Sequence, residues 1–152
     1  MAEFNSVQAQ KVADRKKLIP AESFGRQRVL IATLPASHAS FPANSTILLG
    51  VVPVNSRFLT GGVVSVGGAG TASSTVDIGI RKASTQEVLS AAGIATAVDI
   101  AAAATVPADT GDLIAAAADY ITPADVEVYA TVKGAALAAN QKIRFEIPYV
   151  TD

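Results

Sequence analysis

The sequence predicts an all-β protein: an antiparallel β-sandwich of about eight strands, with a jelly roll as the first choice of topology. Two segments near the C-terminus alternate apolar and polar residues with period two. Short apolar segments of strand length also recur along the rest of the chain, separated by turns rich in glycine and proline. Patterns typical of a helix are scarce. Together these observations favour stacked sheets over a helical or mixed fold.

The clearest strands are residues 125–132 and 142–150. In the first, Val126, Val128, Ala130 and Val132 alternate with Glu127, Tyr129, Thr131 and Lys133. In the second, Ile143, Phe145, Ile147 and Tyr149 alternate with Lys142, Arg144 and Glu146. This period is typical of half-buried strands that cover one side of a core. We expect the two strands to pair as a β-hairpin.

Four earlier segments also read as strands. Residues 28–34 end at Pro35, and residues 46–52 form a continuous apolar run that predicts a central strand buried on both faces. Residues 57–66 contain adjacent glycines at their centre, which predicts a bulge or a bend. Residues 75–82 predict a central strand whose Val76, Ile78 and Ile80 point inward.

The stretch from residue 84 to residue 120 is ambiguous between helix and strand. Alanine is abundant in residues 99–104 and has high helix propensity. However, Ile94, Thr96, Val98 and Ile100 alternate as the residues of a strand do. We therefore favour a strand for residues 94–100 and leave residues 113–120 open.

Composition indicates one domain with a thin core. The chain has 152 residues, including 30 alanines, 5% aromatic residues and no tryptophan. Only 16% of the residues are charged, so much of the surface consists of small residues. Such a surface can pack against neighbouring subunits at little desolvation cost. The alternative is that the small residues reflect only compositional bias or a thin sandwich.

Several classes of protein are not indicated. The chain has no cysteine, which excludes disulfides and thiolate chemistry. No apolar run reaches the roughly 20 residues that a membrane span requires, so we expect no membrane partner. The first residues show no basic and apolar pattern of a secretory signal, and we expect synthesis in a host cytoplasm.

Charge is distributed unevenly along the chain. Residues 1–28 have six basic and three acidic side chains (+3), whereas residues 29–152 have six basic and ten acidic ones (−4). This asymmetry predicts an N-terminal arm, residues 1–25, that reaches over an acidic neighbour, followed by a β-sandwich domain, residues 26–152. The candidate partner-binding residues of the arm are Lys11, Arg15, Lys16, Lys17 and Phe24. The alternative is a solvated, frayed terminus.

The sequence offers little catalytic or metal-binding chemistry. His38 is the one histidine, and no Gly-x-Ser-x-Gly nucleophile motif accompanies it, so we expect a solvated loop histidine and no catalytic residue. A single histidine also argues against a histidine-based metal centre. Asp109 and Asp112 lack the spacing of a calcium-binding loop and predict a turn. We expect no metal and no cofactor.

The sequence patterns that would indicate phosphate or nucleic-acid binding are equally weak. Residues 67–70 are rich in glycine but lack the Gly-Lys-Ser/Thr ending of a phosphate-binding loop, so they predict a hairpin turn. The net charge is −1 and few aromatic residues accompany the basic ones, which argues against specific nucleic-acid binding.

The order of strands and turns resembles the capsid cement or decoration proteins of tailed bacteriophages, some of which are jelly rolls. The resemblance is carried by residues 74–81, the alanine-rich middle, residues 122–132 and residues 143–150. It implies a structural virion protein without catalytic residues, located on the capsid exterior. It further implies that the protein binds the major capsid protein and its own copies, as a dimer or trimer, and reinforces contacts between capsid subunits.

Two other functions fit the same pattern. One is a different virion component, such as a head fibre base, a neck protein or a tail protein. The other is a carbohydrate-binding β-sandwich, which needs a row of exposed aromatic residues; Tyr120, Tyr129 and Tyr149 are few for that purpose.

Overall fold

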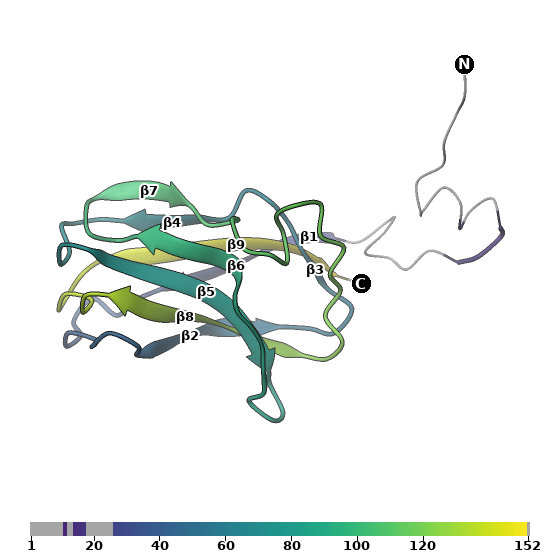
Figure 1. The fold of residues 1–152 in the computed structure, drawn as a ribbon, viewed down its shortest axis with the longest axis horizontal. Coiled ribbons are helices and arrows are strands. Elements are labelled where there is room, and N and C mark those ends of the chain that lie inside the picture. Colours follow the sequence, from purple (N-terminus) through teal and green to yellow (C-terminus); the bar gives the residue numbers. More distant parts are fainter. Residues whose placement is uncertain (1–10, 12–13, 18–25, 152) are drawn as a thin grey trace, which may run out of the picture.

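A computed structural model of the chain describes residues 11, 14–17 and 26–151. The part from residue 26 onward forms nine β-strands (Figure 1). They are β1 (Arg26–Thr33), β2 (Thr46–Val52), β3 (Arg57–Phe58), β4 (Val63–Val66), β5 (Ser74–Lys82), β6 (Val88–Asp99), β7 (Ala104–Pro107), β8 (Val126–Gly134) and β9 (Ile143–Thr151).

The strands form two antiparallel sheets packed face to face. One sheet has the order β1-β9-β4-β7, with the short β3 also pairing with β9, and the other has the order β2-β8-β5-β6. Four of the pairings are nested along the chain: β1 with β9, β2 with β8, β4 with β7 and β5 with β6. Nested antiparallel pairs rolled into two sheets are the arrangement of a jelly roll. The predicted all-β, jelly-roll sandwich is confirmed.

The predicted hairpin between the last two strands is wrong. Both strands exist, but β8 lies between β2 and β5 in one sheet while β9 lies between β1 and β4 in the other. The alternation of apolar residues shows that each strand has one buried face. It does not distinguish a strand that pairs with its neighbour in sequence from one that faces that neighbour across the core.

The prediction that residues 46–52 form a central strand buried on both faces is also wrong. β2 has the predicted bounds but is an edge strand, paired only with β8 among the described strands. Its register shifts between Leu48 and Gly50, and the Leu48 and Val51 side chains are more than half exposed. An apolar run therefore marks the strand but does not fix its place in the sheet.

Residues 57–66 form two strands instead of one bent strand. Gly61 has a φ of 91°, a left-handed conformation that glycine adopts without strain. At Gly62 a Cβ atom would lie 2.8 Å from the carbonyl oxygen of Ala108, so the close approach of the loop that follows β7 also requires glycine. The two glycines separate β3 from β4, and both strands pair with β9.

The ambiguous middle of the chain is resolved in favour of strands. β6 includes most of residues 94–100, which confirms the strand predicted there. Residues 108–120 are turns and irregular structure that pack along β6. The N–H of Gly111 donates to the carbonyl of Ile94 and that of Leu113 donates to the carbonyl of Gly93, at 2.9 Å each.

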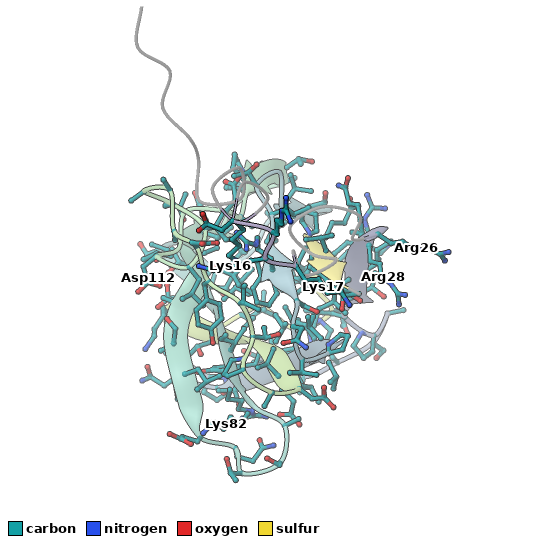
Figure 2. The ribbon with its side chains drawn as sticks, turned by 90° about the vertical axis from the view of Figure 1, so that its right-hand side faces the viewer. Lys16, Lys17, Arg26, Arg28, Lys82 and Asp112 are labelled. Carbon is teal, nitrogen blue, oxygen red and sulfur yellow. The ribbon has the colours of Figure 1, made fainter. Side chains whose placement is uncertain are left out.

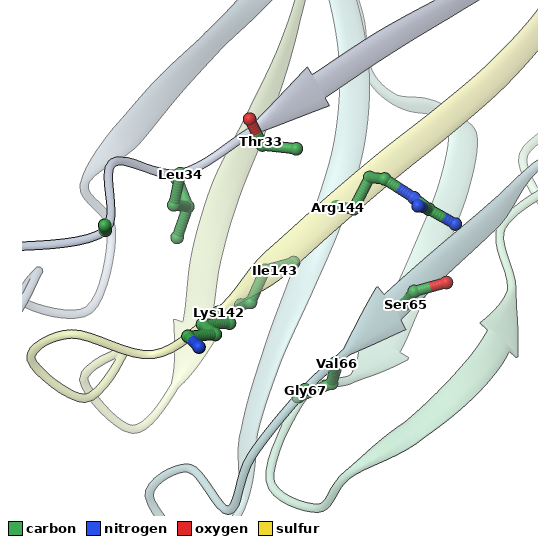
Figure 3. A pocket seen from close by; sticks show the side chains of 9 residues that line it. Thr33, Leu34, Ser65, Val66, Gly67, Lys142, Ile143 and Arg144 are labelled. Atoms are coloured by element: carbon green, nitrogen blue, oxygen red, sulfur yellow. The ribbon is translucent and has the colours of Figure 1, made fainter.

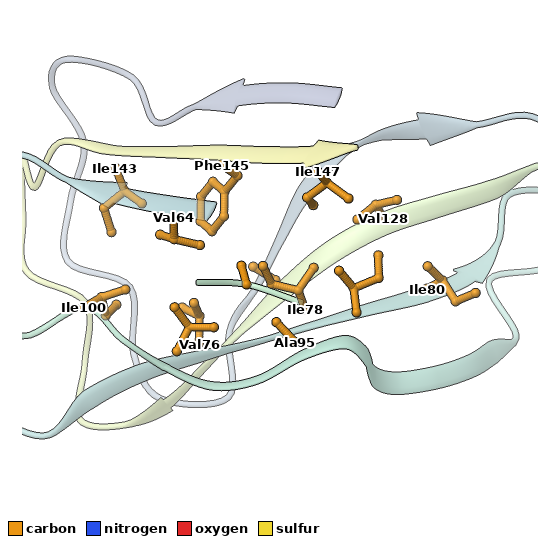
Figure 4. Close-up of a cluster of buried hydrophobic side chains, with 14 of the residues drawn as sticks. Val64, Val76, Ile78, Ile80, Ala95, Ile100, Val128, Ile143, Phe145 and Ile147 are labelled. Atoms are coloured by element: carbon orange, nitrogen blue, oxygen red, sulfur yellow. The ribbon is translucent and has the colours of Figure 1, made fainter. Parts of the chain in front are cut away.

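The core lies between the two sheets and consists mainly of valine and isoleucine (Figure 4). Phe145 on β9 faces a layer that contains Ile78 on β5 and Val128 on β8, and all three side chains are fully buried. Val76, Ile78 and Ile80 are all at 0% exposure, so the inward face predicted for residues 75–82 is confirmed. This packing holds the strands that carry the surfaces described below.

Candidate interaction surface

The structure describes four of the five predicted arm residues. Lys11 is partly buried, whereas Arg15, Lys16 and Lys17 are exposed. The N–H of Lys16 donates to the carbonyl of Lys11 at 2.7 Å, and the Lys16 ammonium lies 3.4 Å from a carboxylate oxygen of Asp14. Phe24 lies outside the described residues. The role of these residues in partner binding stays a prediction.

Further positive charge lies on β1, directly after the predicted arm. Arg26 and Arg28 are exposed and, within the described part of the chain, form no ion pair (Figure 2). By contrast, Arg57, Arg81 and Arg144 in the sandwich each pair with a carboxylate. The two β1 guanidinium groups are thus engaged in no ion pair with the part of the chain that the structure describes.

Most of the large exposed apolar side chains lie on β1 and on β2 with the residues that follow it. Val29 and Ile31 on β1 are 47% and 63% exposed. Leu48 and Val51 on β2, and Val54 just after it, are similarly exposed. Single exposed apolar residues are ordinary, whereas a group of them marks an interaction site.

β1 and β2 are edge strands of opposite sheets on the same side of the sandwich. Their contact is close, because a Cβ atom at Gly50 would lie 2.6 Å from a terminal methyl carbon of Leu30. We call residues 26–33 and 46–54 the β1–β2 flank. Among the described residues, the flank combines two strand edges without a pairing strand, exposed apolar side chains and two arginines without an ion-pair partner.

Sequence analysis missed this flank, although part of its signal was visible. Residues 29–31 are three consecutive large apolar residues in a strand. Because successive side chains point to opposite faces, such a run places apolar side chains on both faces. That pattern was compatible with a strand buried on both faces, and only the sheet order shows that β1 is at an edge.

A second cluster of side chains lies on the outer face of the sheet β2-β8-β5-β6. The Nε of Arg81 on β5 donates to the Glu127 carboxylate on β8 at 2.7 Å, and the Arg81 guanidinium carbon lies 5.1 Å from the centre of the Tyr129 ring. Burial raises the pKa of Tyr129. Hydrogen bonds from Arg81, and secondarily from Gln86, lower the pKa of Glu127. The cluster contains no nucleophile or metal ligand set, and it cross-links two central strands.

The lowered pKa of Glu127 predicts a pH-dependent contribution to stability. The contribution is present above the ordinary pKa of a glutamate and is lost as the pH falls through the lower pKa of the folded state. We expect Glu127→Gln to be less stable than the wild type at neutral pH, with the two unfolding curves converging at acid pH. Urea unfolding followed by circular dichroism across this range measures the difference.

The matched control is Glu87→Gln, because Glu87 pairs with Lys82 in a more exposed ion pair. Exposed pairs contribute little, so we expect this control to follow the wild type closely. A Glu127→Gln variant that keeps the wild-type difference between neutral and acid pH would contradict the role of the Arg81–Glu127 pair.

The tyrosines do not form an exposed row. Tyr129 and Tyr149 are only 4% and 9% exposed, and Tyr120 is partly buried. Carbohydrate-binding surfaces on β-sandwiches need exposed aromatic faces, which these three residues do not provide.

A pocket of about 430 Å³ opens where β1 and β4 end beside the start of β9 (Figure 3). Leu34, Val66 and Ile143 supply its apolar lining, and Thr33, Ser65, Lys142 and Arg144 supply polar groups. A guanidinium nitrogen of Arg144 lies 2.7 Å from the Glu146 carboxylate, so its charge is already paired. The lining residues include no carboxylate and no histidine, and the pocket shows no acid–base pair.

The sequence predicted that His38 is a solvated loop residue, and this prediction is wrong. The His38 ring contacts two loops. Its ring stacks on Phe41 with a centroid distance of 5.0 Å. Nδ1 lies 2.8 Å from the carbonyl oxygen of Ala39, and Nε2 lies 3.0 Å from that of Gln141. The ring therefore connects the loop after β1 to the segment that enters β9.

Asp109 and Asp112 serve local structure. The Asp109 carboxylate accepts the N–H of Gly61, and the Asp112 carboxylate accepts the hydroxyl of Ser90. Within the described residues, no group of three histidine, cysteine, aspartate or glutamate side chains is placed to hold a metal. A search of the same residues finds no helix long and apolar enough to cross a membrane.

The loop at residues 67–70 is not a hairpin turn. It connects β4 in one sheet to β5 in the other. The prediction of a hairpin there is wrong for the same reason as the C-terminal one, because β4 and β5, like β8 and β9, follow each other in the sequence but lie in opposite sheets.

Comparison with known proteins gives structural matches alone: no family model matches the chain, and no curated protein matches its sequence. A chain from the capsid of Ralstonia phage GP4 matches with a TM-score of 0.66 and 17% identity, over 90% of this chain and 92% of that one. A chain from the capsid asymmetric unit of cyanophage Pam1 matches with a TM-score of 0.57 and 17% identity, over the full length of both chains. The protein thus shares its β-sandwich fold with chains of two phage capsid structures.

Proposed function

We propose that this chain is a structural protein of a bacteriophage virion, which binds the capsid exterior and reinforces contacts between major capsid subunits as a cement or decoration protein. The observation that carries the proposal is the full-length fold match to a chain of the cyanophage Pam1 capsid asymmetric unit. The match to the Ralstonia phage GP4 capsid, which covers nine tenths of each chain, supports the same role.

The chemistry of the described surface is consistent with binding instead of catalysis. The Arg81–Glu127 pair and the His38 ring are both engaged in structural contacts. The main exposed features are apolar side chains and unpaired arginines on the β1–β2 flank. Groups of exposed apolar side chains mark interaction sites, and arginine is enriched at protein interfaces.

In this proposal the protein has two attachment elements. Residues 1–25 form an arm whose Lys11, Arg15, Lys16, Lys17 and Phe24 contact a major capsid subunit. The sandwich, from residue 26 onward, contacts a second subunit or another copy of this chain in a dimer or trimer. Joining two contacts in one chain raises the effective affinity by about 10²–10⁴ over either contact alone.

The direct test is binding to empty shells of the major capsid protein encoded in the same genome. We expect the purified chain to co-sediment with the shells at a fixed ratio and to raise the temperature at which they disassemble. Binding without stabilisation would favour a fibre base. Absence from shells, together with binding to isolated neck or tail assemblies, would overturn the cement role and favour another virion component.

A further inference from the structure

The free edge of β1 presents backbone hydrogen-bonding groups. Among the described strands, β1 pairs only with β9. The N–H of Leu34 donates to the carbonyl of Ile143 at 3.1 Å, and this places the even-numbered residues of β1 in hydrogen-bonded pairs with β9. The N–H and C=O groups of Gln27, Val29, Ile31 and Thr33 therefore point away from β9, toward the free edge.

From Val29 to Thr33 this edge lacks the usual protection against pairing with another chain, because the two charges of β1 lie before Val29. β1 has eight residues, contains no proline and pairs with β9 without a register shift. Its exposed side chains at the free-edge positions include Val29 and Ile31, which are apolar. Natural edge strands are normally short, bulged or interrupted by proline or charge.

The opposite side of the sandwich shows such protection. β7 has four residues and ends at Pro107. β6 has several register shifts against β5, and its Gly93 and Ile94 carbonyls accept hydrogen bonds from Leu113 and Gly111. Within residues 26–151, the fold therefore protects one pair of edges and leaves the β1 edge open, as expected if another chain covers it.

The charged residues of the β1–β2 flank indicate the charge that the covering chain has. Arg26 and Arg28 lie on the face of β1 opposite to Val29 and Ile31, because they have the other parity. The β1–β2 flank contains no aspartate or glutamate. A second copy of the same flank would bring two more arginines and no carboxylate, so charge complementarity favours a different, acidic segment.

We propose that the β1 edge docks an extended acidic segment of another protein, which adds to the sheet as a further strand beside β1. Alternate apolar side chains of that segment pack on Val29 and Ile31, and its carboxylates pair with Arg26 and Arg28. The chemistry of the segment follows from the edge itself, whereas its origin in a capsid subunit rests on the proposed function.

The edge can be tested with synthetic peptides and the full-length chain. The probe is a peptide of alternating valine and glutamate that matches the eight residues of β1, and its counterpart alternates valine and lysine. We expect the glutamate peptide to shift the backbone amide NMR signals of residues 27–33 and to slow hydrogen exchange at Val29 and Ile31. The lysine peptide should leave these signals unchanged.

Matched variants separate edge docking from general adhesion. Ile31→Lys should weaken binding of the glutamate peptide, whereas Val88→Lys, at a similarly exposed position on β6, should not. The double variant Arg26→Glu/Arg28→Glu should lose about tenfold in affinity for the glutamate peptide and gain affinity for the lysine peptide. Thermal unfolding of each variant verifies that its fold is retained.

Three results would overturn the proposal: no response at residues 27–33, equal binding of both peptides, or a concentration-dependent dimer in sedimentation that Ile31→Lys dissociates. The last result would identify a second copy as the occupant. Because the peptides test the edge and the shells test the function, either proposal can fail while the other stands.

Discussion

Replacing Phe145 with alanine is expected to lower the free energy of unfolding by about 3–5 kcal/mol, a large part of the total stability of a domain of this size. Phe145 is the largest of the fully buried side chains. It stands in the middle of its sheet, beside Ala32 on β1 and Val64 on β4. The surrounding valines and isoleucines are stiff, so they cannot collapse fully into the cavity.

Urea unfolding measures this loss, and two further variants keep the prediction testable if Phe145→Ala does not fold. Phe145→Leu retains most of the volume and should cost less than the alanine variant. Ile31→Ala removes an exposed apolar side chain and should change stability by less than about 0.5 kcal/mol. A loss at Phe145 no larger than the loss at Ile31 would contradict the assignment of the core.

Deleting residues 1–20 is expected to weaken binding to capsid shells by about 10²–10⁴, while the sandwich stays folded. The strands begin at Arg26, so the truncation removes none of the described β-structure. Loss of one of two linked contacts removes the advantage of effective concentration. Co-sedimentation with shells over a range of protein concentrations measures the change.

A charge variant distinguishes the contribution of the arm's cations from that of its length. Lys11→Gln, Lys16→Gln and Lys17→Gln together keep the full chain but remove three positive charges. We expect this variant to lose part of the affinity, mainly at low salt, because salt screens exposed charges. Undiminished shell binding by the chain lacking residues 1–20 would remove the arm from the proposed function.

Much of the fold was predictable because it depends on local patterns. The alternation in residues 126–132 and 143–149 identified β8 and β9, and the β-branched residues of 94–100 identified the second half of β6 despite the nearby alanines. The inward face of β5 also followed from period two. In each case the pattern records that one side of a strand is buried, a property of the strand itself.

The pairing of strands could not be predicted in the same way. The sequence suggested that β8 pairs with β9, whereas the structure places β8 beside β2 and β9 beside β1. Glycine placement was more informative locally: Gly61 and Gly62 predicted a bulge or a bend in residues 57–66, although two strands are present instead of one. Partner choice depends on how the whole chain closes around the core, and no local pattern records it.

For the β1–β2 flank, too, local patterns predicted some features and not others. The sequence alone determined an all-β chain with aliphatic strands and a basic N-terminal region. Only the tertiary structure decided that β1 and β2 are edges, that apolar side chains of both strands are exposed, and that Arg26 and Arg28 have no ion-pair partner among the described residues. The physical reason is that exposure of a strand depends on which strands lie next to it, and in a jelly roll those neighbours come from distant parts of the chain.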